Sequence, residues 1–151
     1  MISDADLLSI CIFCEANLEP DDGKAAVARV IRNRMALKYE SDGTMTGTVL
    51  RYDQFSWAWF AFVNGHYTRI SDTVDQAMSI AEYKLKHAPA KALAKCAQIG
   101  ASVMAGTYTG ELYDKLTDDT TMYVNLDISK PAWAIPSKQV CVIGRHTFYR
   151  A

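Results

Sequence analysis

Apolar residues recur at helical spacing in four separate stretches of the chain, and this periodicity limits it to a helix-rich fold. In residues 4–16 the stripe passes through Leu7, Ile10 and Cys11, and Ser3 is placed to cap the first turn. Similar stripes predict three more helices: 23–38, one capped by Ser71 with a stripe that reaches Leu85, and one from Pro89 to a stop at Gly106. Short strands are predicted at 122–126, 139–143 and 147–150. We therefore expect an α+β fold, rich in helix, with a small β region at the C-terminal end.

The size and charge of the chain exclude several classes of protein. Its 151 residues suit one domain, which we expect to span 1–151. Half of the residues are hydrophobic and 22% are charged, which excludes disordered and low-complexity chains. Sixteen basic and seventeen acidic residues give a net charge of −1. Because no positive excess is available to bind duplex DNA, we expect no nucleic-acid partner.

The hydropathy of the chain gives no sign of a membrane segment. The longest nearly apolar run, 55–63, is far too short to cross a bilayer, so we expect no stable membrane insertion. Residues 1–6 are acidic where a signal peptide would be basic. We therefore expect synthesis in the cytoplasm without an export signal.

Cysteine and histidine are sparse. Of the four cysteines, Cys11 and Cys14 form a Cys-x-x-Cys pair, but both fall on the apolar stripe of a helix, which favours small core residues over a redox pair. The three histidines, His66, His87 and His146, show no recognised zinc-ligand spacing. We expect neither a metal nor a cofactor.

Glu15 is the first candidate for chemistry. It lies on the flank of the first apolar stripe and at the end of its helix, next to the break at Asn17. A carboxyl group in partly apolar surroundings has a raised pKa and can act as a general acid near neutral pH. The alternative is a solvated surface glutamate, and position alone does not decide between the two.

Arg34 falls in the middle of the apolar face of the second helix, where a charge needs a partner. Glu19, or one of the pair Asp21 and Asp22, is the predicted partner. Such a contact would tie the loop between the first two helices to the second helix. We therefore interpret Arg34 as structural.

An aromatic segment, 54–62, follows a region of turn signals. As a strand it would place Phe55, Trp57 and Trp59 on one face and Gln54 and Ser56 on the other. Aromatic faces beside amide and hydroxyl groups suit a sugar ring. The alternative is that these aromatics pack in the core.

The predicted C-terminal strands contribute further polar candidates. Tyr123 and Asn125 lie two residues apart and therefore on one face of a strand, where both can donate hydrogen bonds to a sugar or acetamido oxygen. His146 is a candidate substrate contact, and the alternative is a structural histidine with its hydrogen bonds satisfied.

Motifs in order along almost the whole chain carry a family resemblance. They are Cys-Glu-Ala-Asn-Leu-Glu-Pro at 14–20, Gly-Lys-Ala-Ala-Val-Ala at 23–28, Ile-Arg-Asn-Arg at 31–34, Gln-Phe-Ser-Trp at 54–57, Tyr-Val-Asn at 123–125, Pro-Ala-Trp-Ala at 131–134, and Ile-Gly-Arg-His-Thr-Phe-Tyr-Arg at 143–150. Together they resemble the cell wall hydrolase family that includes spore cortex-lytic enzymes and a group of phage endolysins.

The resemblance implies a fold like that of lytic transglycosylases and lysozyme, with Glu15 as the catalytic acid. The implied reaction cleaves the β-1,4 bond between N-acetylmuramic acid (MurNAc) and N-acetylglucosamine (GlcNAc) in peptidoglycan and gives a 1,6-anhydro product. The residues expected to contact the glycan are Gln54, Ser56, Trp57, Tyr123, Asn125, Trp133 and His146, with Glu19 and Arg34 as structural residues near the site. The chain departs from the family pattern at Cys14, at Asn17 and Leu18, and at Thr120 and Thr121.

Two other functions stay open at this point. One is a hydrolytic muramidase that uses Glu15 with a second carboxylate, for which Glu19, Asp21 and Asp53 are candidates by motif. The other is a non-catalytic module that binds the cell wall.

The expected biological setting follows from the wall substrate and the acidic N-terminus. A phage endolysin made in the host cytoplasm, and released to the envelope by a holin-like partner that permeabilises the membrane, fits both. We expect it to act as a monomer on the glycan strands of peptidoglycan.

Overall fold

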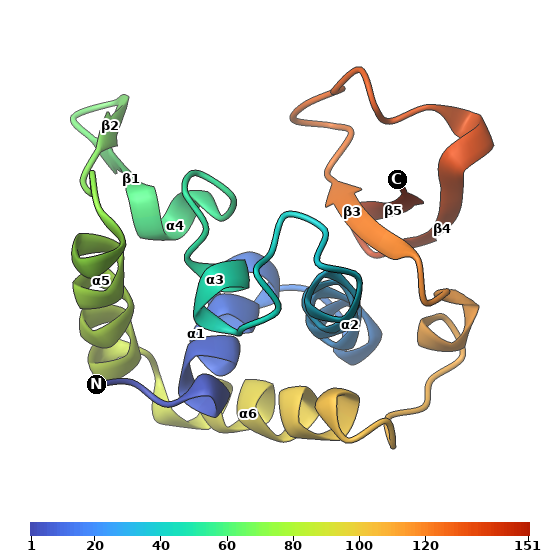
Figure 1. The fold of residues 1–151 in the computed structure, drawn as a ribbon, viewed down its shortest axis with the longest axis horizontal. Coiled ribbons are helices and arrows are strands. Elements are labelled where there is room, and N and C mark those ends of the chain that lie inside the picture. Colours follow the sequence, from blue (N-terminus) through green and yellow to red (C-terminus); the bar gives the residue numbers. More distant parts are fainter.

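The computed structural model describes all 151 residues, 1–151, as a helical base that carries two small sheets (Figure 1). The helices are α1 (Asp4–Ala16), α2 (Asp21–Leu37), α3 (Thr46–Val49), α4 (Ser56–Trp59), α5 (Val74–His87) and α6 (Ala90–Met104). The strands are β1 (Phe60–Val63), β2 (His66–Arg69), β3 (Thr120–Val124), β4 (Gln139–Ile143) and β5 (His146–Arg150). Two 3-10 turns, η1 (Tyr113–Lys115) and η2 (Pro136–Lys138), lie in the C-terminal third.

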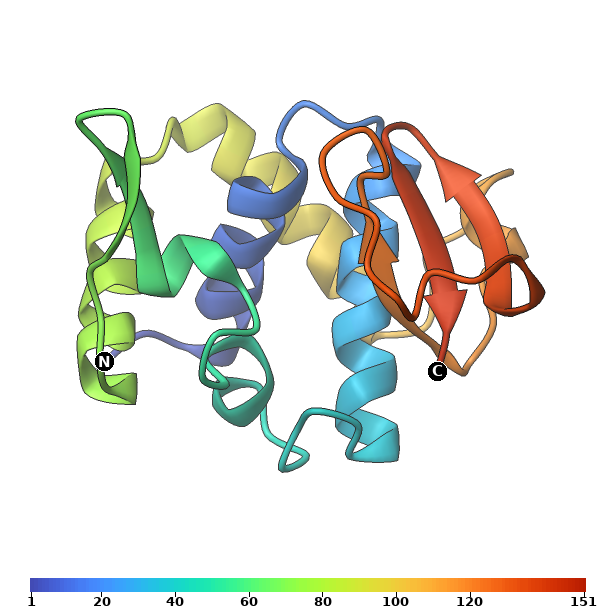
Figure 2. The same cartoon turned by 90° about the horizontal axis from the view of Figure 1, so that it is seen from above.

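The core is formed where α1, α2 and α6 pack together, with α1 across α6 and α2 beside it (Figures 1 and 2). Residues 7–12 of α1 are all buried, as are residues 23–28 of α2. Gly100 lets α6 approach α1 closely, because a Cβ at this position would meet the Leu8 and Ile12 side chains at 3.2 Å. Packing against α2 and α6 therefore fixes the position of α1, including its C-terminal end.

Local sequence signals explain where the helices begin. The Ser3 hydroxyl accepts a hydrogen bond from the Asp6 amide at 3.1 Å, and α1 has the predicted bounds. The third predicted helix begins differently, because Thr73 caps α5 and the Ser71 hydroxyl instead donates to the Ala58 carbonyl at 2.8 Å. Ser71 therefore does not cap the helix, because its hydroxyl is bonded to a buried carbonyl group outside it.

The C-terminal sheet has the order β3-β5-β4 and is antiparallel throughout. Two side chains of α2 attach it to the base. The Asn33 amide donates to the carbonyls of Thr117 and Thr120, and the Arg34 guanidinium donates to the Thr121 carbonyl at 2.7 Å. The start of β3 is thereby fixed against a helix of the base.

The aromatic segment does not form the predicted strand. Ser56–Trp59 is a single helical turn, and the strand β1 begins only at Phe60 and pairs with β2. Phe55, Trp57 and Trp59 are all buried, with Trp59 fully enclosed. The prediction of a sugar-facing strand over 54–62 is wrong at this point, because burying three large aromatics in the core outweighs the β propensity of the segment.

Two further properties of the chain follow from the structure. Its longest helices fall short of the length and hydropathy that a bilayer-crossing segment requires. All four cysteines are free thiols: Cys11, Cys96 and Cys141 are buried, and Cys14 is half-buried. Cys14 therefore lies less deep than the apolar stripe of α1 predicted.

Candidate functional site

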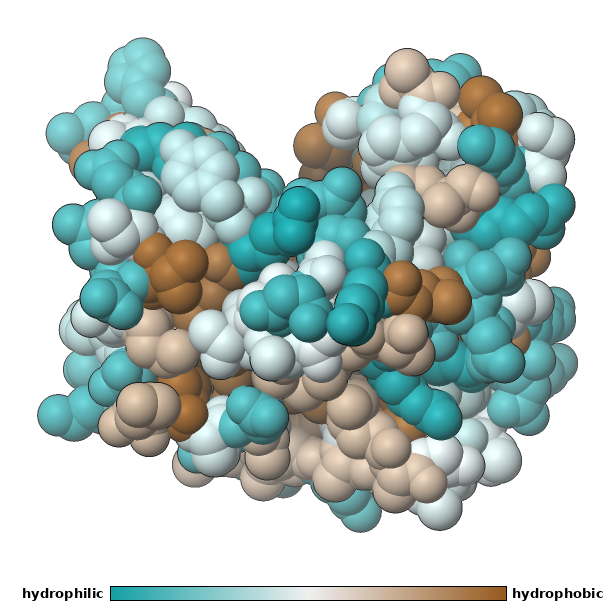
Figure 3. Space-filling model, viewed as in Figure 1, coloured by the Kyte–Doolittle hydropathy of each residue, from teal (hydrophilic) through white to brown (hydrophobic).

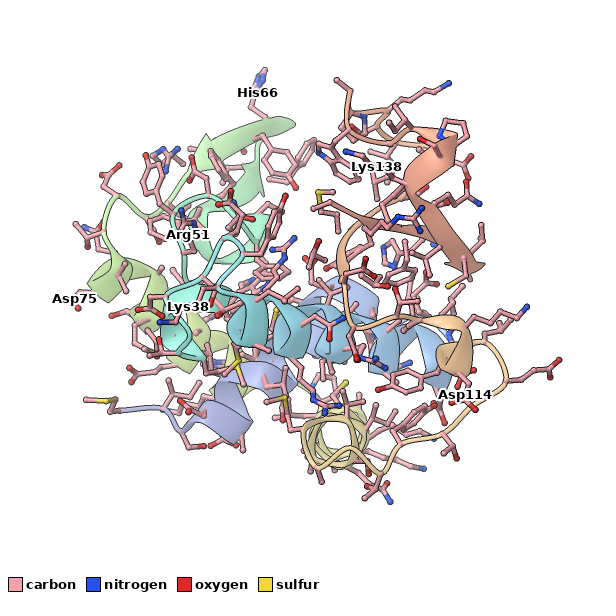
Figure 4. All side chains as sticks on the ribbon, turned by 45° about the vertical axis from the view of Figure 1, so that its right-hand side comes forward. Lys38, Arg51, His66, Asp75, Asp114 and Lys138 are labelled. Atoms are coloured by element: carbon pink, nitrogen blue, oxygen red, sulfur yellow. The ribbon has the colours of Figure 1, made fainter.

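A groove of about 420 Å³ lies where the C-terminal end of α1 meets the C-terminal sheet. Its walls come from 13–19, at the end of α1 and in the loop after it, and from Asn125, Ile128, Arg145 and His146. The space-filling view shows a broad hollow between two raised parts of the molecule (Figure 3). His66 on β2 marks the top of one of these parts, and Lys138 of η2 lies in the other (Figure 4).

Glu15 occupies the last turn of α1 and lines the groove. Its side chain is half-buried, and its only hydrogen bond comes from the Tyr123 hydroxyl, which donates to Oε1. Burial raises the pKa of Glu15, while the Tyr123 hydrogen bond and the positive charge of Arg34 lower that pKa to a smaller extent. Glu15 therefore combines a raised pKa with an Oε2 atom that no protein group occupies.

Tyr123 reaches Glu15 because β3 places its ring over the end of α1. The ring packs between His146, at a centroid distance of 4.9 Å, and Phe148, at 5.5 Å. Burial raises the pKa of Tyr123 well above its usual value, and the charge of Glu15 acts in the same direction. The phenol is therefore a neutral donor whose position is fixed by the sheet.

Glu19 lies in the loop after α1 and is held by the turn between β4 and β5. Its Oε1 accepts a hydrogen bond from the Arg145 amide at 2.9 Å and lies 3.4 Å from His146 Nδ1. Gly144 makes this approach possible, because its φ is +58° and a Cβ there would lie 3.0 Å from the Glu19 carboxylate. Glu19 thus connects the α1–α2 loop to the sheet.

His146 is half-buried between this carboxylate and the Tyr123 ring. Burial lowers the pKa of His146, and the nearby Glu19 opposes that shift. Its Nδ1 has no hydrogen-bond partner, since the Glu19 contact is long. The ring is consequently neutral at pH 7 and lines the groove beside Glu15.

Arg34 does not have the predicted acidic partner. Its Nε donates to the Thr121 carbonyl, and its Nη1 donates to Gln54 Oε1 at 3.2 Å. Each of the expected acidic partners binds another group. Glu19 accepts a hydrogen bond from the β4–β5 turn, Asp21 forms an ion pair with Lys95 at 3.3 Å, and Asp22 accepts a hydrogen bond from the Tyr108 hydroxyl at 2.7 Å. The guanidinium is buried, and it connects β3 to the aromatic segment.

The structure brings some of the other predicted residues to the groove and leaves others away from it. Asn125 lines the groove, with its Oδ1 bonded to the Asp127 amide at 3.0 Å. Gln54 does not line the groove and accepts a hydrogen bond from Arg34, and Ser56 is exposed at the start of α4. Trp57 is 8% exposed, so its burial speaks against direct contact with a sugar. Trp133 packs edge-on against Tyr149 at 5.6 Å and does not line the groove.

Several groove residues were missed by the sequence reasoning. Phe13, Leu18, Ile128 and Arg145 line it together with the predicted residues. Leu18 and Ile128 are more than 80% exposed and flank the opening. The Gly144–Arg145 pair between two predicted strands is a hairpin signal that could have placed Arg145 at the site.

The three candidates for a second carboxylate differ in their surroundings. Asp53 forms an ion pair with Arg69 at 2.9 Å, and Asp21 lines a different pocket beside Lys95. Only Glu19 lines the groove with Glu15. No group of three His, Cys, Asp or Glu side chains is placed to hold a metal ion.

Comparison with known proteins gives a family match and two structural neighbours. A family model described as Cell Wall Hydrolase matches residues 18–149. The catalytic domain of the germination-specific lytic transglycosylase SleB from Bacillus anthracis is similar in fold, with 19% identity and a TM-score of 0.62 over 97% of this chain and 93% of that one. The SleB catalytic domain from Bacillus cereus has 19% identity and a TM-score of 0.64 over 97% and 89%. No curated protein sequence matches significantly. These neighbours confirm the predicted helix-rich α+β fold class.

Proposed function

This chain belongs to the cell wall hydrolase family, and we propose that it cuts peptidoglycan glycan strands at the β-1,4 bond between MurNAc and GlcNAc, as a lytic transglycosylase. The observation that carries the proposal is the state of Glu15: a half-buried carboxyl with a raised pKa that lines the groove and has one oxygen unoccupied. The family match begins at residue 18, so Glu15 is assigned its role from this geometry and from the motif around it.

In the proposed reaction Glu15 acts first as an acid. Its carboxyl gives a proton to the glycosidic oxygen while the bond from that oxygen to C1 of MurNAc breaks, and the bonding electrons leave with the GlcNAc oxygen. The Glu15 carboxylate then removes the proton of the MurNAc C6 hydroxyl as that oxygen bonds to C1. The product is 1,6-anhydro-MurNAc, and Glu15 recovers its proton without a water molecule or a second carboxylate.

The neighbouring residues support these two roles. The Tyr123 hydroxyl holds Oε1, which leaves Oε2 as the atom that exchanges the proton. Arg34 and Tyr123 limit how far the pKa of Glu15 rises, so the group both donates and accepts near neutral pH. We propose Asn125 and His146, which line the groove, as contacts to the glycan.

The hydrolytic alternative needs a second carboxylate that acts on a water molecule or on C1. Glu19 is the candidate in the groove, but its Oε1 is occupied by the Arg145 amide and its side chain is 8% exposed. This arrangement favours a structural role. The description of the Bacillus anthracis SleB domain as a lytic transglycosylase also favours the non-hydrolytic outcome.

Mass spectrometry of the products separates the two reactions. Wild-type protein acting on purified peptidoglycan should release anhydro-muropeptides, which are one water lighter than hydrolysed ones. If only reducing ends appear, the protein is a hydrolase and the transglycosylase proposal is wrong. If wild type and Glu15→Gln both sediment with peptidoglycan and neither releases products, the protein is a wall-binding module.

We also propose the endolysin role as the biological setting. Its test is expression in a bacterial host with and without a membrane-permeabilising partner. Lysis only when the partner is present supports release from the cytoplasm by a holin-like protein. Lysis without the partner contradicts that route.

A further inference from the structure

A second pocket, of about 480 Å³, opens beside the groove and shares Asn17 with it. It lies between the α1–α2 loop and the start of α6, which Figure 2 shows at the same edge of the molecule. Its charged lining consists of Lys24, Lys91 and Lys95 against Asp21. The pocket is therefore positive, although the chain as a whole carries a net charge of −1.

The three lysines are in different states. Lys24 is 8% exposed, and its ammonium group donates to the Glu19 carbonyl. Lys95 lies 3.3 Å from Asp21, whereas Lys91 is exposed and has no acidic partner. The pocket thus holds three ammonium groups and a single carboxylate, and Lys91 is the lysine that has no partner within the protein.

On the groove side the positive charge continues beyond the pocket. Lys84 of α5 lies near enough to Cys14, a groove residue, to oppose the rise that burial causes in the pKa of that thiol. The positive charge of Lys84 therefore acts at this edge of the groove in addition to the lysines of the pocket.

We propose that this lysine pocket binds the carboxylates of the peptide stem of peptidoglycan, so that the protein prefers stem-bearing glycan to bare glycan. The inference rests on the proposed function. The stem hangs from the lactyl group at C3 of MurNAc, two ring bonds from the reacting C1. A stem on the sugar in the groove can therefore reach an adjoining pocket, since each extended residue spans about 3.3–3.6 Å.

The test compares stem-bearing glycan strands with strands stripped by an amidase. Wild type should cleave the stem-bearing strands with a kcat/KM about tenfold higher, because two exposed charge pairs contribute a few-fold each. Lys91→Glu combined with Lys95→Glu should remove this preference by lowering kcat/KM on the stem-bearing strands to its value on stripped strands. The control Lys115→Glu makes the same kind of charge change at an exposed lysine of η1, outside the groove and the pocket, and should keep the preference.

A binding measurement separates this inference from the proposed function. Glu15→Gln should bind a soluble disaccharide tetrapeptide more tightly than the same muropeptide with amidated carboxylates, and the two lysine substitutions should abolish the difference. If wild type cleaves neither glycan, the glycosidase proposal fails, and this titration still decides on the pocket. Equal binding of both muropeptides, or displacement by inorganic phosphate without any effect of the stem carboxylates, would overturn the inference.

Discussion

The C-terminal sheet and the β1–β2 hairpin both rise above the helical base, but they present different chemistry. The sheet supplies Tyr123 and His146, which are half-buried, fixed by ring contacts and placed at Glu15. The hairpin presents Phe62 and Tyr67, which face each other across the strands and are 70% and 67% exposed. This contrast predicts that the sheet side is the reactive one, because it holds polar residues against a half-buried carboxyl group, whereas the hairpin presents exposed aromatics alone.

Glu15→Gln should produce the largest change, on the sheet side. Removing a general acid typically lowers the rate by about 10²–10⁴-fold, and sedimentation with peptidoglycan should persist. Product release measured by chromatography gives the rate, and Glu111→Gln, at an exposed position, is the matched control. Equal clearance of peptidoglycan by wild type and Glu15→Gln would show that Glu15 is not the acid.

The same variant has a predicted effect on stability. Since burial raises the pKa of Glu15, the folded protein keeps this proton at pH values where the unfolded chain has released it. The stability from protonated Glu15 is present below the unfolded pKa and is lost as the pH rises through the folded one. The free energy of unfolding of Glu15→Gln, relative to that of wild type, should therefore increase as the pH rises through this range. Above the folded pKa the difference between the two proteins should be constant, and urea titrations at several pH values measure it.

Arg34→Met would break the connection between the two regions. It leaves the Thr121 carbonyl and Gln54 without their donor, and buried acceptors left unpaired should lower the free energy of unfolding by about 2–3 kcal/mol. Arg51→Met removes an exposed arginine that pairs with Glu40 and should cost less than about 1 kcal/mol. Similar losses in both variants, measured by urea denaturation, would mean that the buried bridge is dispensable.

Tyr123→Phe tests the sheet side through the pH dependence of the reaction rate. The hydroxyl lowers the pKa of Glu15, so its removal should move the alkaline limb of the pH–rate profile to higher pH. Loss of a hydrogen bond to a charged group should also reduce the optimal rate by about tenfold. Tyr108→Phe removes the other tyrosine–carboxylate bond, to Asp22, and should leave the profile in place. If the alkaline limb of Tyr123→Phe does not shift, the Tyr123 hydroxyl does not set the pKa of the catalytic acid.

Phe62→Ser with Tyr67→Ser should give the smallest effect. Exposed substitutions usually change free energies by no more than about 0.5 kcal/mol, which corresponds to about twofold in kcat/KM. The pH–rate profile should match that of wild type. A tenfold loss on long glycan strands would reverse the comparison and assign the hairpin to substrate binding.

The sequence predicted the long helices well and the contacts between distant residues poorly. The bounds of α1 followed from a local signal, the Ser3 cap. The single turn of α4 did not, because four residues are too few to show helical periodicity. The meeting of Tyr123 with Glu15 joins positions 108 residues apart, and the partners of Arg34 depend on where β3 and Gln54 arrive in space. No local pattern encodes such meetings.

The sulfur chemistry of the chain has a practical consequence. All four cysteines are free, and burial is the largest cause of the raised pKa of each: about 11 for Cys14, well above the usual value for Cys11, and raised for Cys96 and Cys141. Oxidants and disulfides react with the thiolate, which is scarce in all four at neutral pH. The fold is therefore held together without a disulfide, and we expect its thiols to react slowly with oxidants at neutral pH.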